Sequence, residues 1–88
     1  MLVIHRRKND YISIINKEKN KAYDIRVGNY NKINSIVEIT VNKEDVIMNL
    51  NTDDCVHAIE DDVLIVLFSV DNGVKLGLKA DRSWKIIF

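Results

Sequence analysis

Proline is absent from this chain of 88 residues, and glycine occurs only three times. The turns must therefore come mainly from Asn and Asp, whose short polar side chains favour turn conformations. The single cysteine, Cys55, excludes an intramolecular disulfide and is typical of a protein of the reducing cytosol. We therefore expect a cytoplasmic protein whose fold depends on its apolar core.

Long apolar runs are also lacking. The longest, Val63 to Phe68, is far shorter than the roughly 20 residues that a membrane-spanning helix needs. The N-terminus alternates and turns basic after a few residues, where a secretory leader would begin an apolar block. The sequence thus predicts neither a membrane span nor a signal peptide.

Patterns that indicate catalysis or metal binding are equally scarce. Cys55 and His57 have neither the number nor the spacing of ligands that a zinc site needs. The acidic residues from Asp53 to Asp62 lack the glycine and the periodicity of a calcium loop. No nucleophile, base and orienting group form a recognisable set, and no Gly-rich phosphate loop occurs. We expect no enzyme activity, no metal and no cofactor.

The net charge is zero, but the charges are unevenly placed along the chain. Residues 1–32 hold eight Lys or Arg against three Asp or Glu, residues 33–62 hold one against eight, and residues 63–88 hold four against two. A focused basic patch can bind phosphate even when the whole molecule is neutral, with affinity that depends strongly on salt.

The strongest structural signal lies in the last third of the chain. Val63 to Val70 is an apolar run of strand length, Asn72-Gly73 is a preferred hairpin turn, and Val74 to Ala80 alternates apolar and polar residues. Trp84 to Phe88 alternates again, which predicts a third strand of the same meander. Its apolar face must be covered by the rest of the chain, by a second copy, or by both.

Shorter strands are predicted upstream, and the period changes after Val41. Asn42 can cap a helix, and two carboxylates follow it where the helix dipole favours them. Val46, Ile47 and Leu50 would form the apolar stripe of that helix. We therefore predict a small, mostly β, antiparallel sheet protein with one short helix. The upstream strands are expected at Met1 to Lys8, Tyr11 to Ile15, Ala22 to Val27, Ile33 to Val41 and Cys55 to Ile59.

Several of these pieces, taken in order, resemble the bacterial carbon storage regulators (the CsrA/RsmA family). MLVIHRR at the start is similar to the family's M-L-x-L-x-R-R, IEDDV at 59–63 to its I-G-D-x-[IV], and VKLGLKA at 74–80 to its V-x-I-G-I-x-A-P. The resemblance covers residues 1–14 and 59–88. It implies one domain, 1–88, that forms an intertwined homodimer, with residues 15–58 as an insertion.

A second architecture is compatible with the same resemblance. ITVNKEDV at 39–46 is similar to the family's final strand where it runs into a C-terminal helix, V-x-V-x-R-E-E-I. On that interpretation the chain is a degenerate tandem, with a near-complete first copy and a second copy that lacks the opening strand.

The resemblance implies a post-transcriptional regulator of translation. Such proteins bind single-stranded GGA in hairpin loops of messenger RNA leaders, block ribosome access, and can be opposed by a protein antagonist. In the family the RNA lies where the first strand of one subunit meets the last strand of the other. The residues here that match or support that surface are Ile4, His5, Arg6, Arg7, Lys79 and Arg82.

Arginine suits RNA contacts because its planar fork can pair with a guanine edge or a phosphate and can stack on a base. Arg6 and Arg7 are equally consistent with a solubilising charge cluster on an edge strand. Trp84 could be a stacking platform, although a lone tryptophan in a small domain more often belongs to the core or to a dimer interface.

The end of the chain departs from the family pattern. Phe88 stands where the family has a terminal arginine that contacts RNA, and Asp81 stands where it has proline. The alternative is therefore a protein-interaction module on the same scaffold that has lost RNA binding. The acidic residues 33–62 would suit a basic protein surface.

Overall fold

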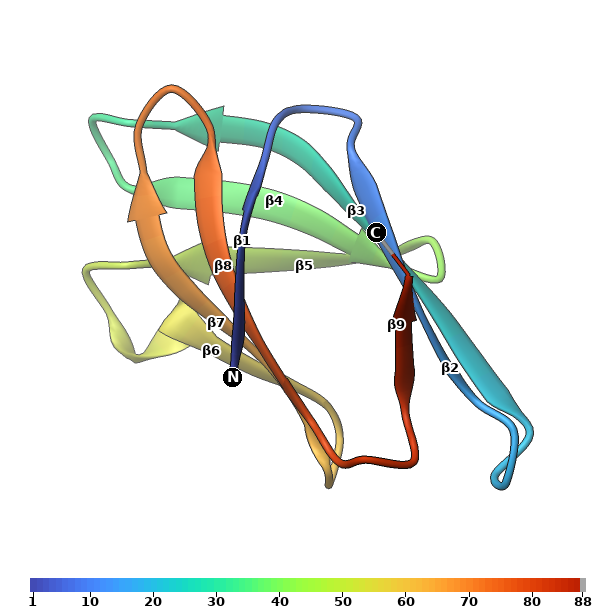
Figure 1. Ribbon diagram of the computed structural model, residues 1–88. Coiled ribbons are helices and arrows are strands. Elements are labelled where there is room, and N and C mark those ends of the chain that lie inside the picture. The colour runs from blue at the N-terminus through green and yellow to red at the C-terminus, as the bar shows by residue number, and fades with distance from the viewer. Residues whose placement is uncertain (88) are drawn as a thin grey trace.

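The computed structural model describes residues 1–87, which form nine strands in two antiparallel sheets (Figure 1). The four-stranded sheet has the order β1-β8-β7-β6, and the five-stranded sheet has the order β5-β4-β3-β2-β9. The prediction of a mostly β protein is confirmed. The strands are β1 (Leu2–Arg6), β2 (Tyr11–Asn16), β3 (Lys21–Asn31), β4 (Ile36–Val41), β5 (Glu44–Asn49), β6 (Val56–Glu60), β7 (Val63–Val70), β8 (Val74–Ala80) and β9 (Lys85–Ile87).

The two sheets enclose one apolar core. Alternate residues of each strand point inward, so that both sheets contribute to a shared cluster of buried side chains. Burying each large aliphatic side chain of this kind stabilises the fold by roughly 1.5–3 kcal/mol. The apolar face of the C-terminal hairpin is thus covered by the rest of the chain, as two of the three predicted alternatives require. The largest of the fully buried side chains are Ile14, Ile25, Ile39, Met48, Ile65, Leu67 and Leu76.

The last strand does not continue the C-terminal meander. β7 and β8 pair as predicted, but β9 crosses to the other sheet and pairs with β2, where Ile86 lies opposite Ile14. The prediction that the last strand is the third strand of the meander is therefore wrong. The turn at residues 81–83 redirects the chain and places Trp84 in the core, only 5% exposed, with its ring 5.9 Å from that of Tyr23. Burial of the indole favours this crossing.

The predicted helix after Val41 is wrong, because residues 44–49 form strand β5. Asn42 and Lys43 both have positive φ, 51° and 72°, which is the conformation of a type I′ hairpin turn between β4 and β5. The Asn42 side chain holds this turn against β3, since it accepts from the Asp24 N–H and donates to the Ala22 carbonyl. Met48 is fully buried, and Val46, two positions earlier, is partly buried. The buried side chains therefore repeat every second residue, as in a strand, and not with the period of a helix.

Within residues 1–87 the one helical segment is η1 (Asp53–Cys55), a single 3₁₀ turn capped by Thr52. Residues 39–46 resemble a strand that runs into a helix, but residues 44–46 belong to strand β5. The helical part of that similarity is therefore wrong. Residues 15–58, predicted as an insertion, supply β3, β4, β5, η1 and most of β6. These residues form three strands of the five-stranded sheet, so that this sheet would be incomplete without them.

The first and last strands belong to different sheets. β1 pairs with β8 of its own chain, and Val3 lies opposite Gly77. Each of β1 and β9 is an edge strand with one unpaired side in the described chain. The intertwined homodimer stays a prediction. No helix within residues 1–87 has the length and hydropathy needed to cross a membrane.

The β4–β5 turn leads to a prediction that distinguishes a hairpin from a helix. One substitution changes the free energy of unfolding in opposite directions in the two structures. Lys43→Gly should raise the free energy of unfolding by about 1 kcal/mol, because glycine adopts positive φ without the cost that a side chain incurs. In a helix the same change would lower it by about 1 kcal/mol. Asp45→Gly, in the extended part of β5, is the matched control and should destabilise the protein. Urea denaturation measures both, and a destabilised Lys43→Gly variant would contradict the turn.

Candidate nucleic-acid interface

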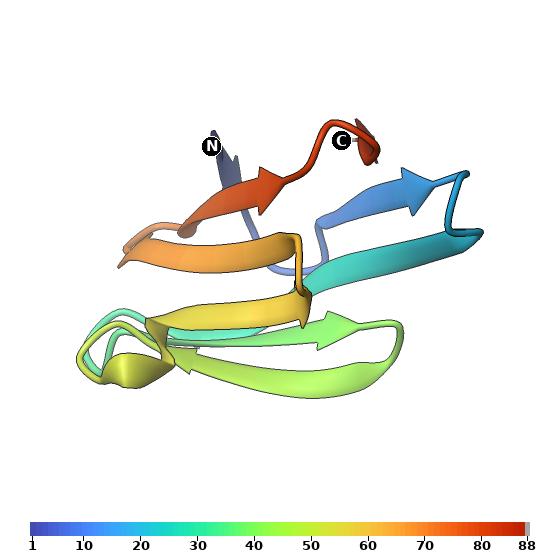
Figure 2. The same ribbon diagram turned by 90° about the horizontal axis from the view of Figure 1, so that it is seen from below.

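The fold separates the charges of the chain onto two opposite sides. Figure 2 shows β1 and β9 at one side of the two sheets, and β5, β6 and η1 at the other. Residues 1–10 and 74–87, which form the first side, hold seven Lys or Arg against two Asp. Residues 33–62 hold one Lys against eight Asp or Glu, and the five carboxylates from Glu38 to Asp54 lie on the second side, whereas the three from Glu60 to Asp62 lead into the turn beside Trp84. We call these the cationic side and the acidic side.

Three of the predicted RNA-binding residues meet at one end of the cationic side. His5, Arg6 and Arg7 line a hollow of about 410 Å³ together with the β7–β8 turn. Arg6 is half-buried and donates from Nη1 to the His5 carbonyl at 2.8 Å, whereas Arg7 is exposed just beyond β1. The two arginines are therefore gathered where an exposed turn leaves room for a ligand.

The two carboxylates at this hollow already have partners. Asp10 accepts the backbone N–H of Arg7 at 2.9 Å, and Asp71 forms an ion pair with Lys32 at 2.9 Å. The ion pair with Lys32 offsets part of the negative charge of Asp71, although exposed ion pairs of this kind are weak.

The other predicted residues lie elsewhere. Ile4 faces the core, with 8% of its surface exposed. Lys79 and Arg82 are exposed at the opposite end of β1, because Leu78 pairs with Leu2 while Val74 pairs with Arg6. That end is separated from the hollow by the length of β1, roughly 13 Å.

The outward face of the four-stranded sheet carries candidates that the site prediction left out. Lys75 lies directly opposite His5 and shares this face with Lys79. Phe68 stands at a β-bulge between Leu67 and Ser69 and exposes 41% of its surface here. The signal in the sequence was an aromatic residue at an outward position of an otherwise aliphatic strand.

Trp84 is part of the core and not a stacking platform. Its indole N–H donates to Asp62 Oδ2 at 3.0 Å, and the Lys19 ammonium lies 5.8 Å from its ring centroid. Lys19 also pairs with Asp62 at 3.1 Å. The hydrogen bond from Trp84, assisted by that from Lys19, lowers the pKa of Asp62.

A parallel contact joins the two sheets through Glu60. Its Oε1 accepts from Lys21 and from the Tyr23 hydroxyl, each at 2.7 Å. The Lys21 hydrogen bond, followed by that of Tyr23, lowers the pKa of Glu60, while the bond to Glu60 raises the pKa of Tyr23. Glu60 and Asp62 thus tie β6 and the β6–β7 turn to the five-stranded sheet.

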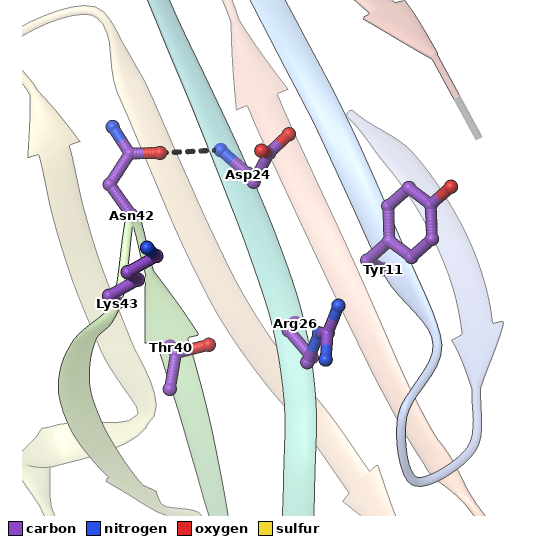
Figure 3. A pocket seen from close by; sticks show the side chains of 6 residues that line it. All are labelled: Tyr11, Asp24, Arg26, Thr40, Asn42 and Lys43. Atoms are coloured by element: carbon purple, nitrogen blue, oxygen red, sulfur yellow. Dashed lines mark hydrogen bonds between the residues drawn. The ribbon is translucent and has the colours of Figure 1, made fainter.

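A larger hollow, of about 900 Å³, lies on the outward face of the five-stranded sheet (Figure 3). Arg26 and Lys43 supply positive charge there, but Asp24 shares the hollow and Asp45 lies opposite Thr40 in the same cross-strand row. The charge of this face is balanced, so it has no preference for a polyanion. The lining residues are Tyr11, Asp24, Arg26, Thr40, Asn42 and Lys43.

Comparison of the chain with protein-family models, with curated proteins and with solved structures gives no match. Among residues 1–87, no three His, Cys, Asp or Glu side chains are grouped so that they could hold a metal ion.

The carboxylate contacts predict a specific pH dependence. Because the folded pKa values of Asp62 and Glu60 lie below their ordinary values of 3.8 and 4.5, their contribution to stability is present above those values. It is lost as the pH falls through the lowered folded values. Urea denaturation followed by Trp84 fluorescence between pH 7 and about pH 2 should show this loss, and the double variant Asp62→Asn, Glu60→Gln should flatten it.

The control for this experiment is Glu18→Gln, an exposed carboxylate in the turn between β2 and β3. It should leave the acid limb of the curve as it is in the wild-type protein. An unchanged acid limb in the double variant would show that other groups cause the acid sensitivity.

Proposed function

We propose that this protein is an RNA-binding, post-transcriptional regulator that recognises GGA-containing messenger RNA leaders through its cationic side and blocks ribosome access. The observation that carries the proposal is the segregation of charge, with seven Lys or Arg against two Asp in the segments that form the cationic side. The resemblance of residues 1–14 and 59–88 to the carbon storage regulators supplies the choice of RNA and of GGA.

The position of the acidic residues supports the same proposal. An acidic stretch as long as residues 33–62 would repel RNA if it lay beside the contact surface. Most of it lies instead on β4, β5 and η1, across the molecule from β1 and β9, whereas Asp62 at its end contacts the turn before β9 and pairs there with Lys19. The resulting charge asymmetry would orient the protein with its cationic side toward a phosphate backbone during approach.

Arg7 is the residue best placed for a specific contact. It is exposed at the rim of the hollow formed with the β7–β8 turn, and its fork can pair with a guanine edge. Phe88, which replaces the family's terminal arginine, lies outside the described residues. Arg82 and Lys85 are exposed on the turn to β9 and on β9, and they would contribute positive charge toward phosphates. We propose that the regulator acts in the cytoplasm as a homodimer.

A titration with hairpin RNA tests this function. At one fixed salt concentration, the wild-type protein should bind a hairpin with a GGA loop more tightly than one whose two loop guanines are replaced. Arg7→Gln should weaken GGA binding by roughly 5- to 100-fold, because it removes a bidentate base contact. Lys43→Gln, on the acidic side, is the control and should bind as the wild type does. Equal affinities for the two hairpins, or none for either, would refute the proposal.

A second candidate function, a protein-interaction module, is favoured by the apolar side chains of the acidic side. Ile47 on edge strand β5 is 64% exposed, and it shares its face of the strand with Asp45, two residues earlier. Exposed apolar residues among carboxylates suit a basic protein partner that has an apolar centre.

Capture from native lysate treated with nuclease separates the two functions. A protein partner of the acidic side should survive nuclease and be lost with Ile47→Ser, whereas partners bridged by RNA should disappear with nuclease. Val3→Ser, an exposed aliphatic change on the cationic side, is the control and should retain the partner. A captured set that nuclease removes completely would exclude the protein-interaction module.

A further inference from the structure

Gly77 forms the floor of an aromatic platform on the outward face of the four-stranded sheet. A Cβ atom built at Gly77 would lie 2.4 Å from Cε2 of Phe68 and 2.5 Å from Sδ of Met1. Both distances are far below van der Waals contact, so the Phe68 ring and the Met1 thioether occupy the space above the glycine backbone. We call Phe68, Met1 and the underlying Gly77 the Phe68 platform.

The platform is partly open to solvent. Phe68 is 41% exposed and Met1 is 64% exposed, and Val3, opposite Gly77 on β1, is 47% exposed. The ring atoms Cε2 and Cζ of Phe68 lie over the Gly77 backbone while the residue stays 41% exposed, so that an aromatic side chain offers apolar surface to a ligand at little cost in side-chain entropy.

The charged side chains around this surface on the sheet are lysines. Lys75 and Lys79 lie two residues before and after Gly77 on β8, and therefore share its face. His5 lies opposite Lys75 on β1. Among the described strand residues that point outward from this sheet, none is Asp or Glu. They are Val3, His5, Val56, Ala58, Leu64, Val66, Phe68, Ser69, Lys75, Gly77 and Lys79.

We propose that the Phe68 platform binds an unstacked base of single-stranded RNA, with the flanking phosphates against Lys75 and Lys79. The proposal rests on the proposed RNA-binding function and assigns to it a stacking subsite. An aromatic face between cations is the combination that binds single-stranded nucleic acid, because each base has a π face and each nucleotide a phosphate. The two lysines are roughly 13 Å apart along β8, which leaves the ring between them.

Charge decides between RNA and the other occupants of an apolar face. Two copies of the chain packed through this face would bring their lysines together without a carboxylate on the face to compensate. A phosphate backbone supplies the missing negative charge on both flanks of the ring. The aliphatic residues of the neighbouring strands, Val66 among them, extend the surface on which bases can lie.

The test uses a fluorescein-labelled hairpin RNA with a GGA loop and measures its binding by anisotropy over a range of salt concentrations. Phe68→Leu keeps an apolar side chain and removes the ring, and it should weaken binding roughly 5- to 100-fold with an unchanged salt slope. Lys75→Gln and Lys79→Gln should each reduce the slope by about 0.7, the value for one phosphate of a single strand. Tyr11→Leu, which removes a 60% exposed ring on the other sheet, is the matched control and should bind as the wild type does.

A second measurement needs no variant. The same hairpin with 5-bromouridine beside the GGA should crosslink under ultraviolet light to the peptide that contains Phe68, as identified by mass spectrometry. Wild-type binding with neither a Phe68 crosslink nor an effect of Phe68→Leu would overturn the platform and leave the proposed function standing.

Three further outcomes would also overturn the platform. Absence of wild-type binding to the hairpin would overturn both the platform and the function. A concentration-dependent dimer in sedimentation, lost in Phe68→Leu while RNA affinity is unchanged, would show that a second copy covers this face. Retention of a protein from nuclease-treated lysate that depends on Phe68, with RNA affinity unchanged, would assign the face to a protein partner.

Discussion

The structure depends on the burial of two apolar sheet faces against each other. Neither sheet can be stable in water by itself, because each exposes a row of Ile, Val and Leu on one side until the other sheet covers it. The two ends of the chain belong to opposite sheets, because β1 pairs with β8 and β9 pairs with β2. Trp84, buried at the crossing, and the contacts of Glu60 and Asp62 lock the sheets together at that end.

The same topology organises the charges. The segment from 33 to 62 forms the edge strands β5 and β6 and the turn η1 between them, whereas the two termini form β1 and β9. A chain with a net charge of zero thus has sides of opposite sign. This arrangement lets a cationic surface and an acidic surface act independently, which is why an RNA-binding side and a protein-binding side are both compatible with one small fold.

The sequence predicted those strands whose side chains alternate clearly, such as Val63–Val70 and Val74–Ala80 with their Asn-Gly turn. It failed at Asn42, because a capping residue, two acidic residues and an apolar stripe are as compatible with a short helix as with a turn and an edge strand. Burial of Met48 and the hydrogen bonds from Asn42 to β3 decide between them, and both are contacts with residues distant in the sequence.

For the candidate site, the sequence indicated the basic residues of β1. It did not indicate the Phe68 platform, because Met1, Phe68 and Gly77 are far apart in the sequence and meet only when β1, β7 and β8 pair.

The sequence by itself determined that this is a mostly β protein with an uneven charge distribution, because alternation, turn residues and charge runs are local properties. Only the tertiary structure decided that β9 leaves the hairpin, that Trp84 is core, and that most of the acidic stretch lies across the molecule from the basic ends. The physical reason is that strand partners and sheet faces are selected by which apolar surfaces can bury one another, and that choice is made by the whole chain at once.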